Sequence, residues 1–477
     1  MELALSEGED LSGTLRIPDE DLTDTVRCSV CSLGLAARAS SPSWYIHACI
    51  SGALHAICIR WRPKISMLAR KRSGPLLASN FVDAVSRQAA DFTIDVIAVT
   101  TLSASATEMG VLNALGTLAF LIFGIPIGVL VDRMPHVRTI FMSGLLRCGV
   151  LSTVVLAWSL EALTIPHVYG AAFVAGTASV FTETAQTAIT PHIAGKDAVS
   201  SIISTMRSAE SAIGLVVPAA AGTTIALIGA GPLLAIAAAF SVLAALIILK
   251  QNTAEIAESG EQKVVTNARN PNSFIRFFRE AREGWATLKR TRVLWRLTVC
   301  ALLMNFGLAV HSAIEVILVL RTLGLDESVL GLIVSSGALG GFAGSLIALP
   351  LTKIFSQRKV LQIAAWILPA AAMLTFIALI DLSRAVGWLL AGALCWGVLI
   401  VIFNILIAGL TAESIPTKFM GRVSASRRTL TMGIVPIGSI AGGLLGDLIA
   451  ISVAVVAWIS LTLIAAAVST SALVREA

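Results

Sequence analysis

Long apolar segments recur along the chain beyond residue 80, and short polar turns separate them. A helix needs about 20 mostly apolar residues to cross the hydrocarbon core of a bilayer. A barrel strand needs only about ten alternating residues, whereas these segments are longer and apolar on every side, so they predict helices. We predict spans over residues 80–103, 109–131, 138–160, 166–190, 198–225, 229–249, 293–320, 328–350, 359–381, 385–411, 424–446 and 449–472.

The composition agrees with a membrane protein. Hydrophobic residues make up 56% of the 477 positions and charged residues 13%, where an ordinary soluble domain has about 25% charged residues. So few charges cannot cover the surfaces of soluble domains, which argues against a cytosolic enzyme and against a nucleic-acid partner. We therefore predict an all-α polytopic membrane protein with twelve transmembrane helices.

The positions of the basic residues predict the orientation. Short loops rich in Lys and Arg stay on the cytoplasmic side. If the chain enters the first span from the cytoplasm, the inner loops hold most of the basic residues, and the outer loops hold only Arg321 and Arg384. We expect both termini to be cytoplasmic, in a multi-pass protein of the cell membrane.

One long basic connection divides the spans into two sets of six. We predict a cytoplasmic extension over residues 1–75, a first six-helix bundle over 76–250, a cytoplasmic linker over 251–292 and a second six-helix bundle over 293–477. Within the linker, aromatic residues from Phe274 to Trp285 recur at helical spacing between arginines. This pattern favours a helix lying on the inner membrane surface, and a solvated linker helix is the alternative.

The first 66 residues carry weaker signals. The start is polar and acidic, which is typical of disorder, and the apolar run over residues 44–59 is short for a span. Cys28 and Cys31 form a lone CxxC pair, which is too few ligands for a metal site. Met67 opens a short basic leader, so translation starting there is a hypothesis that leaves the earlier residues out of the native protein.

The two sets of spans repeat one another. Pro191 and then Pro218 follow span four, and Pro416 and then Pro436 follow span ten in the same order. A parallel duplication of this kind is typical of transporters in which two bundles rock around a central cavity. The two prolines inside spans five and eleven predict kinks.

The loop between spans two and three carries the sharpest motif, which reads Gly-Val-Leu-Val-Asp-Arg from residue 128. It resembles the Gly-x-Leu-Ala-Asp-Arg-x-Gly-Arg-Arg loop of the major facilitator superfamily, although residues 135–137 depart from that pattern. The matching positions are Gly128, Leu130, Asp132, Arg133 and Arg138. The resemblance implies that this loop braces the cytoplasmic side when the protein faces outward, and a structural ion pair in a basic loop is the alternative.

Further motifs are similar to the drug:proton antiporter branch, which includes macrolide-efflux and enterobactin-exporter types. They are the segment over residues 421–438, Arg147 after two leucines, and the linker segment over residues 280–285. The resemblance implies a fold of two pseudo-symmetric six-helix bundles, export of a small molecule and protons as the coupling ion.

Several polar side chains fall inside the predicted spans, where each ionised group costs about 2.5–3.5 kcal/mol or more. We expect a substrate or proton pathway among Arg87, Asp91, Asp95, Arg147, Glu183, Arg207, Glu210, Asn305 and Asn404. Arg87, Asp91 and Asp95 form one stripe along span one. Asp91 can exchange protons, or it can form a structural bridge with Arg87. Glu183 is expected to pair with Arg147 or Arg207, as a relay, a latch or a structural pair.

The polytopic pattern favours a membrane transporter. The resemblance implies a monomeric, secondary active one that exports small amphipathic molecules such as drugs, macrolides or siderophores, and so contributes to drug resistance. The motifs of phosphate-binding loops, zinc proteases and serine hydrolases do not occur, so we expect neither an enzyme nor a cofactor or metal. A lipid or metabolite permease of the same fold is the nearest alternative. A non-transporting receptor or scaffold is a further one.

Overall fold

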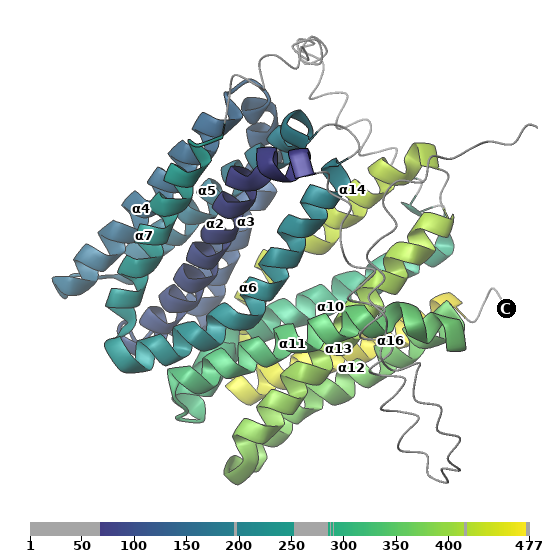
Figure 1. Cartoon of the computed structure of the whole chain (residues 1–477). Coiled ribbons are helices and arrows are strands. Elements are labelled where there is room, and N and C mark those ends of the chain that lie inside the picture. The colour runs from purple at the N-terminus through teal and green to yellow at the C-terminus, as the bar shows by residue number, and fades with distance from the viewer. Residues whose placement is uncertain are drawn as a thin grey trace, which may run out of the picture. The chain divides into compact units, whose positions relative to one another are not determined.

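The computed structural model describes residues 67–194, 198–251, 285–286, 288–289, 291–414 and 417–473. Every regular element in these ranges is a helix (Figure 1). The cysteine pair, the run over residues 44–59 and residues 252–284 of the linker lie outside them.

The helices fall into two sets in chain order. The first set is α2 (Met67–Thr100), α3 (Ala106–Val131), α4 (His136–Ser159), α5 (Ile165–Ala194), α6 (Val199–Ile228) and α7 (Ala230–Ile248). The second set is α10 (Arg292–Ile317) with the π-turn η2 (Leu318–Thr322), α11 (Glu327–Ile354), α12 (Gln357–Ile380), the short 3₁₀ turn η3 (Leu382–Arg384), α13 (Ala385–Ser414), α14 (Thr417–Gly433), α15 (Val435–Leu448) and α16 (Ile451–Leu473). We call these sets the first and second halves.

The helix packing repeats between the halves. In the first half α2 packs on α6 and α7, α3 on α5, and α4 on α5 and α7; in the second half α10 packs on α15 and α16, α11 on α13, and α12 on α13 and α16. Each partner in one half therefore has an equivalent in the other. The predicted fold class of an all-α polytopic membrane protein is confirmed.

Ten helices in the described ranges are long and apolar enough to cross a membrane. The two long helices that fall short are α2 and α5, because they carry the polar residues described below. Both pack within the first half, where α5 contacts α3 and α4. Their polar side chains face protein and a cavity, so we treat α2 and α5 as spans as well.

Helix boundaries differ from the sequence expectation at two places. The first helix begins at Met67 rather than near residue 80, which makes it 34 residues long. The expected span over residues 424–446 is interrupted, since α14 ends at Gly433 and α15 starts with Pro436 in its first turn. Proline lacks an N–H and fits the first turn of a helix, where that donor has no partner.

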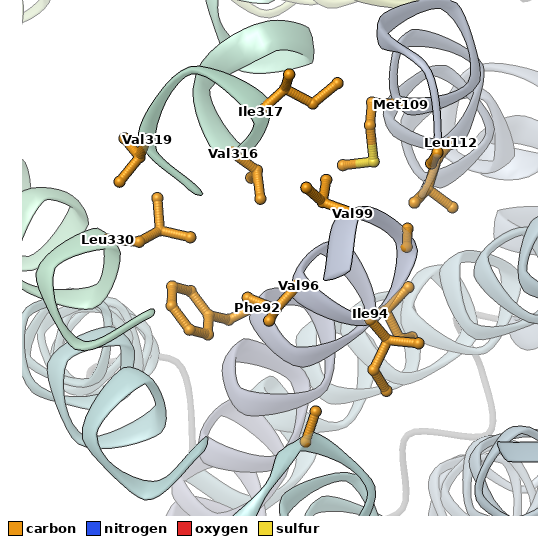
Figure 2. Packing of buried hydrophobic residues seen from close by; sticks show 14 of the residues in the cluster. Phe92, Ile94, Val96, Val99, Met109, Leu112, Val316, Ile317, Val319 and Leu330 are labelled. Atoms are coloured by element: carbon orange, nitrogen blue, oxygen red, sulfur yellow. The ribbon is translucent and has the colours of Figure 1, made fainter. Parts of the chain in front are cut away.

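The buried cores show where the halves join. One large cluster takes side chains from both halves: Phe92 and Val96 of α2, Met109 of α3, Val316 of α10 and Leu330 of α11 (Figure 2). We call the end of the helices at which these residues lie, around the turn over residues 101–105, the closed end. Away from it each half has a core of its own, around Ile189 in the first half and Phe403 in the second.

Candidate functional site

A cavity of about 360 Å³ lies within the first half, between α2, α3, α4 and α5. Its polar lining includes Arg87, Asp91, Asp95, Asn113, Thr117, Arg147, Ser179 and Glu183. Five of the residues expected in a substrate or proton pathway therefore meet here. The remaining lining is largely apolar, and it includes Ile94, Leu112, Phe120 and Leu151.

A stripe of charged residues runs along α2 toward this cavity. Asp83, Arg87, Asp91 and Asp95 follow one another at intervals of four residues, so they lie on one face of the helix. Asp83 is buried with 4% of its surface exposed, whereas Asp91 is exposed to the cavity. The stripe thus passes from a buried carboxylate to accessible ones.

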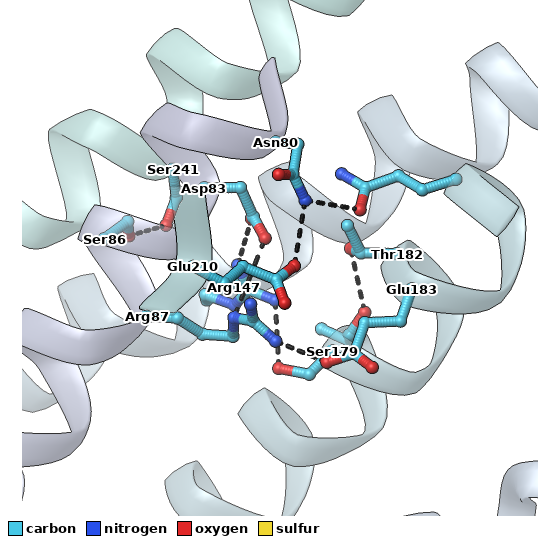
Figure 3. A network of polar contacts seen from close by, with 12 residues as sticks. Asn80, Asp83, Ser86, Arg87, Arg147, Ser179, Thr182, Glu183, Glu210 and Ser241 are labelled. Atoms are coloured by element: carbon cyan, nitrogen blue, oxygen red, sulfur yellow. Dashed lines mark hydrogen bonds and ion pairs between the residues drawn. The ribbon is translucent and has the colours of Figure 1, made fainter. Parts of the chain in front are cut away.

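Two ion pairs tie α2 to its neighbours. Arg147 of α4 is 1% exposed, and its Nη1 donates to Oδ1 of Asp83. Arg87 donates from Nη1 to Oε1 of Glu183 on α5 at 2.5 Å, and its Nε lies 3.9 Å from Oδ2 of Asp83. Both arginines therefore already hold a carboxylate (Figure 3).

Further hydrogen bonds join α2 and α4 to their neighbours, and some of them reach α6 (Figure 3). Nη2 of Arg147 donates to the hydroxyl of Ser179 at 3.0 Å. Nδ2 of Asn80 donates to Oε1 of Gln186 at 3.1 Å and to Oε1 of Glu210 at 3.2 Å. Arg207 donates to Oε2 of Glu210 at 2.7 Å, from a side chain that is 57% exposed. Two sets of polar contacts therefore tie α2 to its neighbours. The set around Asp83 and Arg87 reaches α4 and α5, and the set around Asn80 reaches α5 and α6.

The expected pairing of Glu183 with Arg147 or Arg207 is wrong, because Arg87 takes Glu183 while Arg147 and Arg207 hold Asp83 and Glu210. The alternative bridge between Arg87 and Asp91 does not form either, since Asp91 has no ion pair within the described part of the chain. Asp91 and Asp95 thus remain as cavity-lining carboxylates without an arginine of their own.

The two expected asparagines lie elsewhere. Nδ2 of Asn305 donates to the carbonyl of Ala301 in its own helix at 2.8 Å, and Asn404 is exposed. Neither contributes to the lining of the cavity in the first half. The structure therefore does not place the two asparagines next to the stripe of charged residues on α2.

The loop between α3 and α4 is accessible in this conformation. Asp132 forms the C-cap of α3, and Asp132, Arg133 and Arg138 are all exposed. None of the three forms an ion pair with another residue that the structure describes. Gly128 lies in the last turn of α3, with open space where a side chain would stand.

Charged residues join the halves at the closed end. Both carboxylate oxygens of Asp447, in α15, accept backbone N–H groups in the first turn of α3, from Ala106 at 2.8 Å and Thr107 at 2.7 Å. Arg321 of η2 donates to the carbonyls of Ala104 and Val99 at 3.0 and 3.1 Å, where α2 ends. A negative charge thus meets the positive start of one helix, and a positive charge meets the negative end of another.

Glycines let the backbones of the halves meet at the same end. A side-chain carbon on Gly443 of α15 would lie 2.3 Å from the carbonyl oxygen of Ala106. On Gly331 of α11 it would lie 2.3 Å from the carbonyl oxygen of Pro218 in α6. The hydroxyl of Ser335 also accepts the N–H of Ala219 at 3.0 Å. The contacts of α3 with α15 and of α6 with α11 are equivalent under the repeat.

Sequence reasoning missed several of these residues. Asp83, Asn80 and Gln186 complete the network, and Asp447 makes the contact between halves. Asp83 stands four residues before Arg87, so the same spacing that marked the stripe includes it. An acidic residue in the last turn of a helix opposes the helix dipole, which marks Asp447 as a residue with another partner.

Comparison with known proteins agrees with this architecture. The model of the Major Facilitator Superfamily matches residues 76–426. Macrolide efflux protein A of Streptococcus pyogenes is 23% identical over 356 residues, which are 74% of this chain and 84% of that protein.

Solved structures share the fold at low sequence identity. A bacterial homologue of the iron transporter ferroportin, solved in an inward-facing state, has a TM-score of 0.67 at 14% identity and covers 84% of this chain and 98% of its own. A bacterial homologue of the lysosomal transporter Spinster, also inward-facing, has a TM-score of 0.62 at 15% identity, with 86% and 98% covered. The nucleoside transporter NupG has a TM-score of 0.62 at 14% identity, with 84% and 98% covered.

Proposed function

The chain belongs to the Major Facilitator Superfamily and is a membrane transporter, and from this premise we propose that it exports small amphipathic molecules in exchange for protons. The proposed location is the cell membrane, with both termini in the cytoplasm and the protein acting as a monomer. The similarity to a macrolide efflux protein supports the outward direction. Import or translocation of a lipid or metabolite by the same fold is the alternative.

The charge balance around the cavity carries the proposal. Asp83, Asp91, Asp95 and Glu183 line or adjoin the cavity, and within the described ranges the arginines that do so are Arg87 and Arg147. Two carboxylates in excess are costly in a membrane interior unless a cation or a proton neutralises them. A cationic substrate and protons competing for these sites would give exchange.

Asp91 is the best candidate for the exchanging group. It is exposed to the cavity, and one helical turn separates it from Arg87, which Glu183 occupies. A motion that changed the distance between α2 and α5 would free Arg87 to approach Asp91, which would drive a proton off that carboxyl group. Asp95 lies one turn further along and offers the next acceptor.

Alternating access accounts for the contacts between the halves. In the described conformation, Asp447, Arg321, Ser335 and close backbone contacts join the halves at the closed end. We propose that this closed end is the extracytoplasmic one, so the conformation faces inward. In the outward-facing state the loop from Gly128 to Arg138 would then brace the cytoplasmic end, where its charges are accessible now.

Transport into everted membrane vesicles with an imposed pH gradient tests the proposal. A panel of dyes, macrolides and siderophores is tested with the wild type, Asp91→Asn and Asp91→Glu, with Asp381→Asn in an exposed turn as the matched control. We expect Asp91→Asn to abolish gradient-driven uptake at unchanged protein levels, and Asp91→Glu to retain part of it.

The result that contradicts the proposal is gradient-driven uptake by Asp91→Asn at the wild-type rate. An uncoupler serves as the second control, since uptake that survives it is not driven by protons. Uptake that dissipates no proton gradient favours the permease alternative.

A further inference from the structure

A second cavity lies entirely within the second half. Its volume is about 190 Å³, and α10, α11, α12, α13 and α16 enclose it together with η2. It has no lining residue in common with the cavity of the first half. Most of its wall is apolar, and the polar or aromatic groups on it are His311, Glu315, Thr375, Trp396 and Trp458.

Three aromatic rings form one wall of this cavity. The ring of His311 stacks on Trp458 with centroids 4.0 Å apart and planes 10° from parallel. Trp396 is tilted against the same indole at 4.7 Å. These side chains come from three different helices, and His311 and Trp458 are only 9% and 3% exposed. The wall is therefore held in place by packing before any ligand arrives.

The same rings have unused hydrogen-bonding capacity. Nδ1 of His311 and Nε1 of Trp458 are buried and have no hydrogen-bond partner. Leaving a buried polar atom unpaired costs free energy that a folded protein normally avoids. The indole N–H of Trp458 can only donate, whereas the Nδ1 of a neutral His311 can accept. The unpaired imidazole nitrogen on this wall therefore favours a ligand that brings a hydrogen-bond donor.

Glu315 adds a negative charge one helical turn beyond His311. The carboxylate is half-buried, lines the cavity and forms no ion pair with any residue in the described ranges. An unpaired carboxylate inside a membrane protein is expensive, and a cation relieves the cost. Indole faces attract cations as well, through the quadrupole of the ring.

We propose that this cavity is a second ligand-binding site, which takes a protonated amine carried on an apolar ring. Glu315 would hold the ammonium group, and the rings of His311, Trp396 and Trp458 would pack on the apolar part. The volume is below the roughly 300–1,000 Å³ of drug-sized pockets, so the site fits one ring or one aminated ring of a larger molecule. As a site for a transported substrate, it rests on the proposed function.

Two glycines allow matched tests of where a ligand binds. Gly337 lines the second cavity, and a side-chain carbon there would meet nothing closer than the carbonyl oxygen of Ala393 at 3.6 Å. Gly116 lines the cavity of the first half, and a carbon there would meet nothing within 4 Å. Leucine at either position would fill one cavity without forcing the backbones apart.

The experiment measures equilibrium binding of radiolabelled phenethylamine to the full chain in lipid nanodiscs, without any gradient. We expect saturable binding by the wild type and a roughly tenfold weaker affinity for Glu315→Gln and for Gly337→Leu. Affinities should stay within about twofold of the wild type for the matched variant Gly116→Leu and for the control Asp381→Asn. Uncharged phenethyl alcohol should compete poorly. Unchanged gel-filtration and melting profiles show that each variant is folded.

The inference is overturned by three results. They are no saturable binding to the wild type, unchanged binding to both Glu315→Gln and Gly337→Leu, or loss of binding in Gly116→Leu, which would place the ligand in the first half. The outcome is separate from that of the vesicle assay, because binding needs no transport. Gradient-driven uptake by Asp91→Asn would contradict the proposed proton coupling through Asp91, but it would not affect the conclusion from the binding experiment.

Discussion

Replacing Asp447 with asparagine should loosen the closed end without unfolding either half. The carboxylate belongs to α15 in the second half and accepts two backbone N–H groups at the start of α3 in the first half, at 2.8 and 2.7 Å. Asparagine keeps the size of the side chain but has a single carbonyl oxygen and no charge. The variant therefore loses one hydrogen bond and the attraction to the positive end of α3.

The expected size of the effect follows from these contacts. A hydrogen bond to a charged group contributes about 1.5–3 kcal/mol, and a charge at a helix end about 0.3–1 kcal/mol. Asp447 is exposed, so water screens both contributions and reduces them. A loss of about 1.4 kcal/mol is a reasonable expectation, which changes the ratio of closed to open conformations about tenfold.

Spin labels at the closed end would report this ratio as a distance distribution. Leu160, between α4 and α5, and Leu382, between α12 and α13, are 67% and 66% exposed and belong to different halves. Leu160→Cys and Leu382→Cys in a cysteine-free background give one labelled pair. We expect Asp447→Asn to raise the share of long distances, and Arg321→Gln to do the same.

Asp326→Asn is the matched control, because Asp326 is an exposed residue of the second half that caps α11 without a side-chain hydrogen bond. It should leave the distances unchanged. If Asp447→Asn gives the wild-type distribution, or one shifted to shorter distances, the contact does not hold the halves together and the reasoning is wrong.

Three further outcomes follow from contacts inside the halves and at their edge. Asp83→Asn leaves its buried arginine partner on α4 without a counter-charge, so we expect about 3–5 kcal/mol of destabilisation and a large loss of folded protein in a thermal melt. Gly340→Val should also unfold the protein, because the new carbon would lie 2.1 Å from a backbone oxygen of the same half. In Gly443→Val the new carbon would lie 2.3 Å from a backbone oxygen of the other half, so this variant should instead lengthen the spin-label distances. The hydroxyl of Ser383 donates to Asp381 in the turn before α13 and lowers the pKa of that carboxyl. A lowered folded-state pKa means that the contribution of Asp381 is present above its unfolded pKa of about 3.9 and is lost as the pH falls through the folded value. The protection of amides in this turn, measured against their intrinsic exchange rates, should therefore fall only in acid, and Asp381→Asn should remove that dependence.

The number and order of the spans were predictable from the sequence, because an apolar run of about 20 residues is long enough for a membrane-spanning helix and too long for a barrel strand. The polar residues of α2 and α5 did not prevent this, since the apolar runs around them were still long enough. The break before Pro436 was harder to place, because a proline inside an apolar run is compatible with either a kink or a new helix. In the structure a new helix begins there, and it packs against α3 and α10.

The partners of the buried charges were not predictable in the same way. The sequence gives the depth of Glu183 on its helix but not the rotation of that helix toward α2 or α4. Any arginine at a similar depth on a neighbouring helix is then an equally good candidate to pair with Glu183. In the structure the partner is Arg87. The acidic cavity itself follows from spacing along α2 alone, which is why Arg87, Asp91 and Asp95 were found together.

The two kinds of polar contact in this molecule suit two different mechanical tasks. Within the first half, Asp83 and Arg147 are nearly inaccessible to solvent, so separating them would leave two buried charges uncompensated at a cost of several kcal/mol. Between the halves, Asp447 and Arg321 are exposed and bind helix ends, so water can replace their partners at small cost. Motion that changes access should therefore part the halves at the closed end and keep the helices of the first half together as one body.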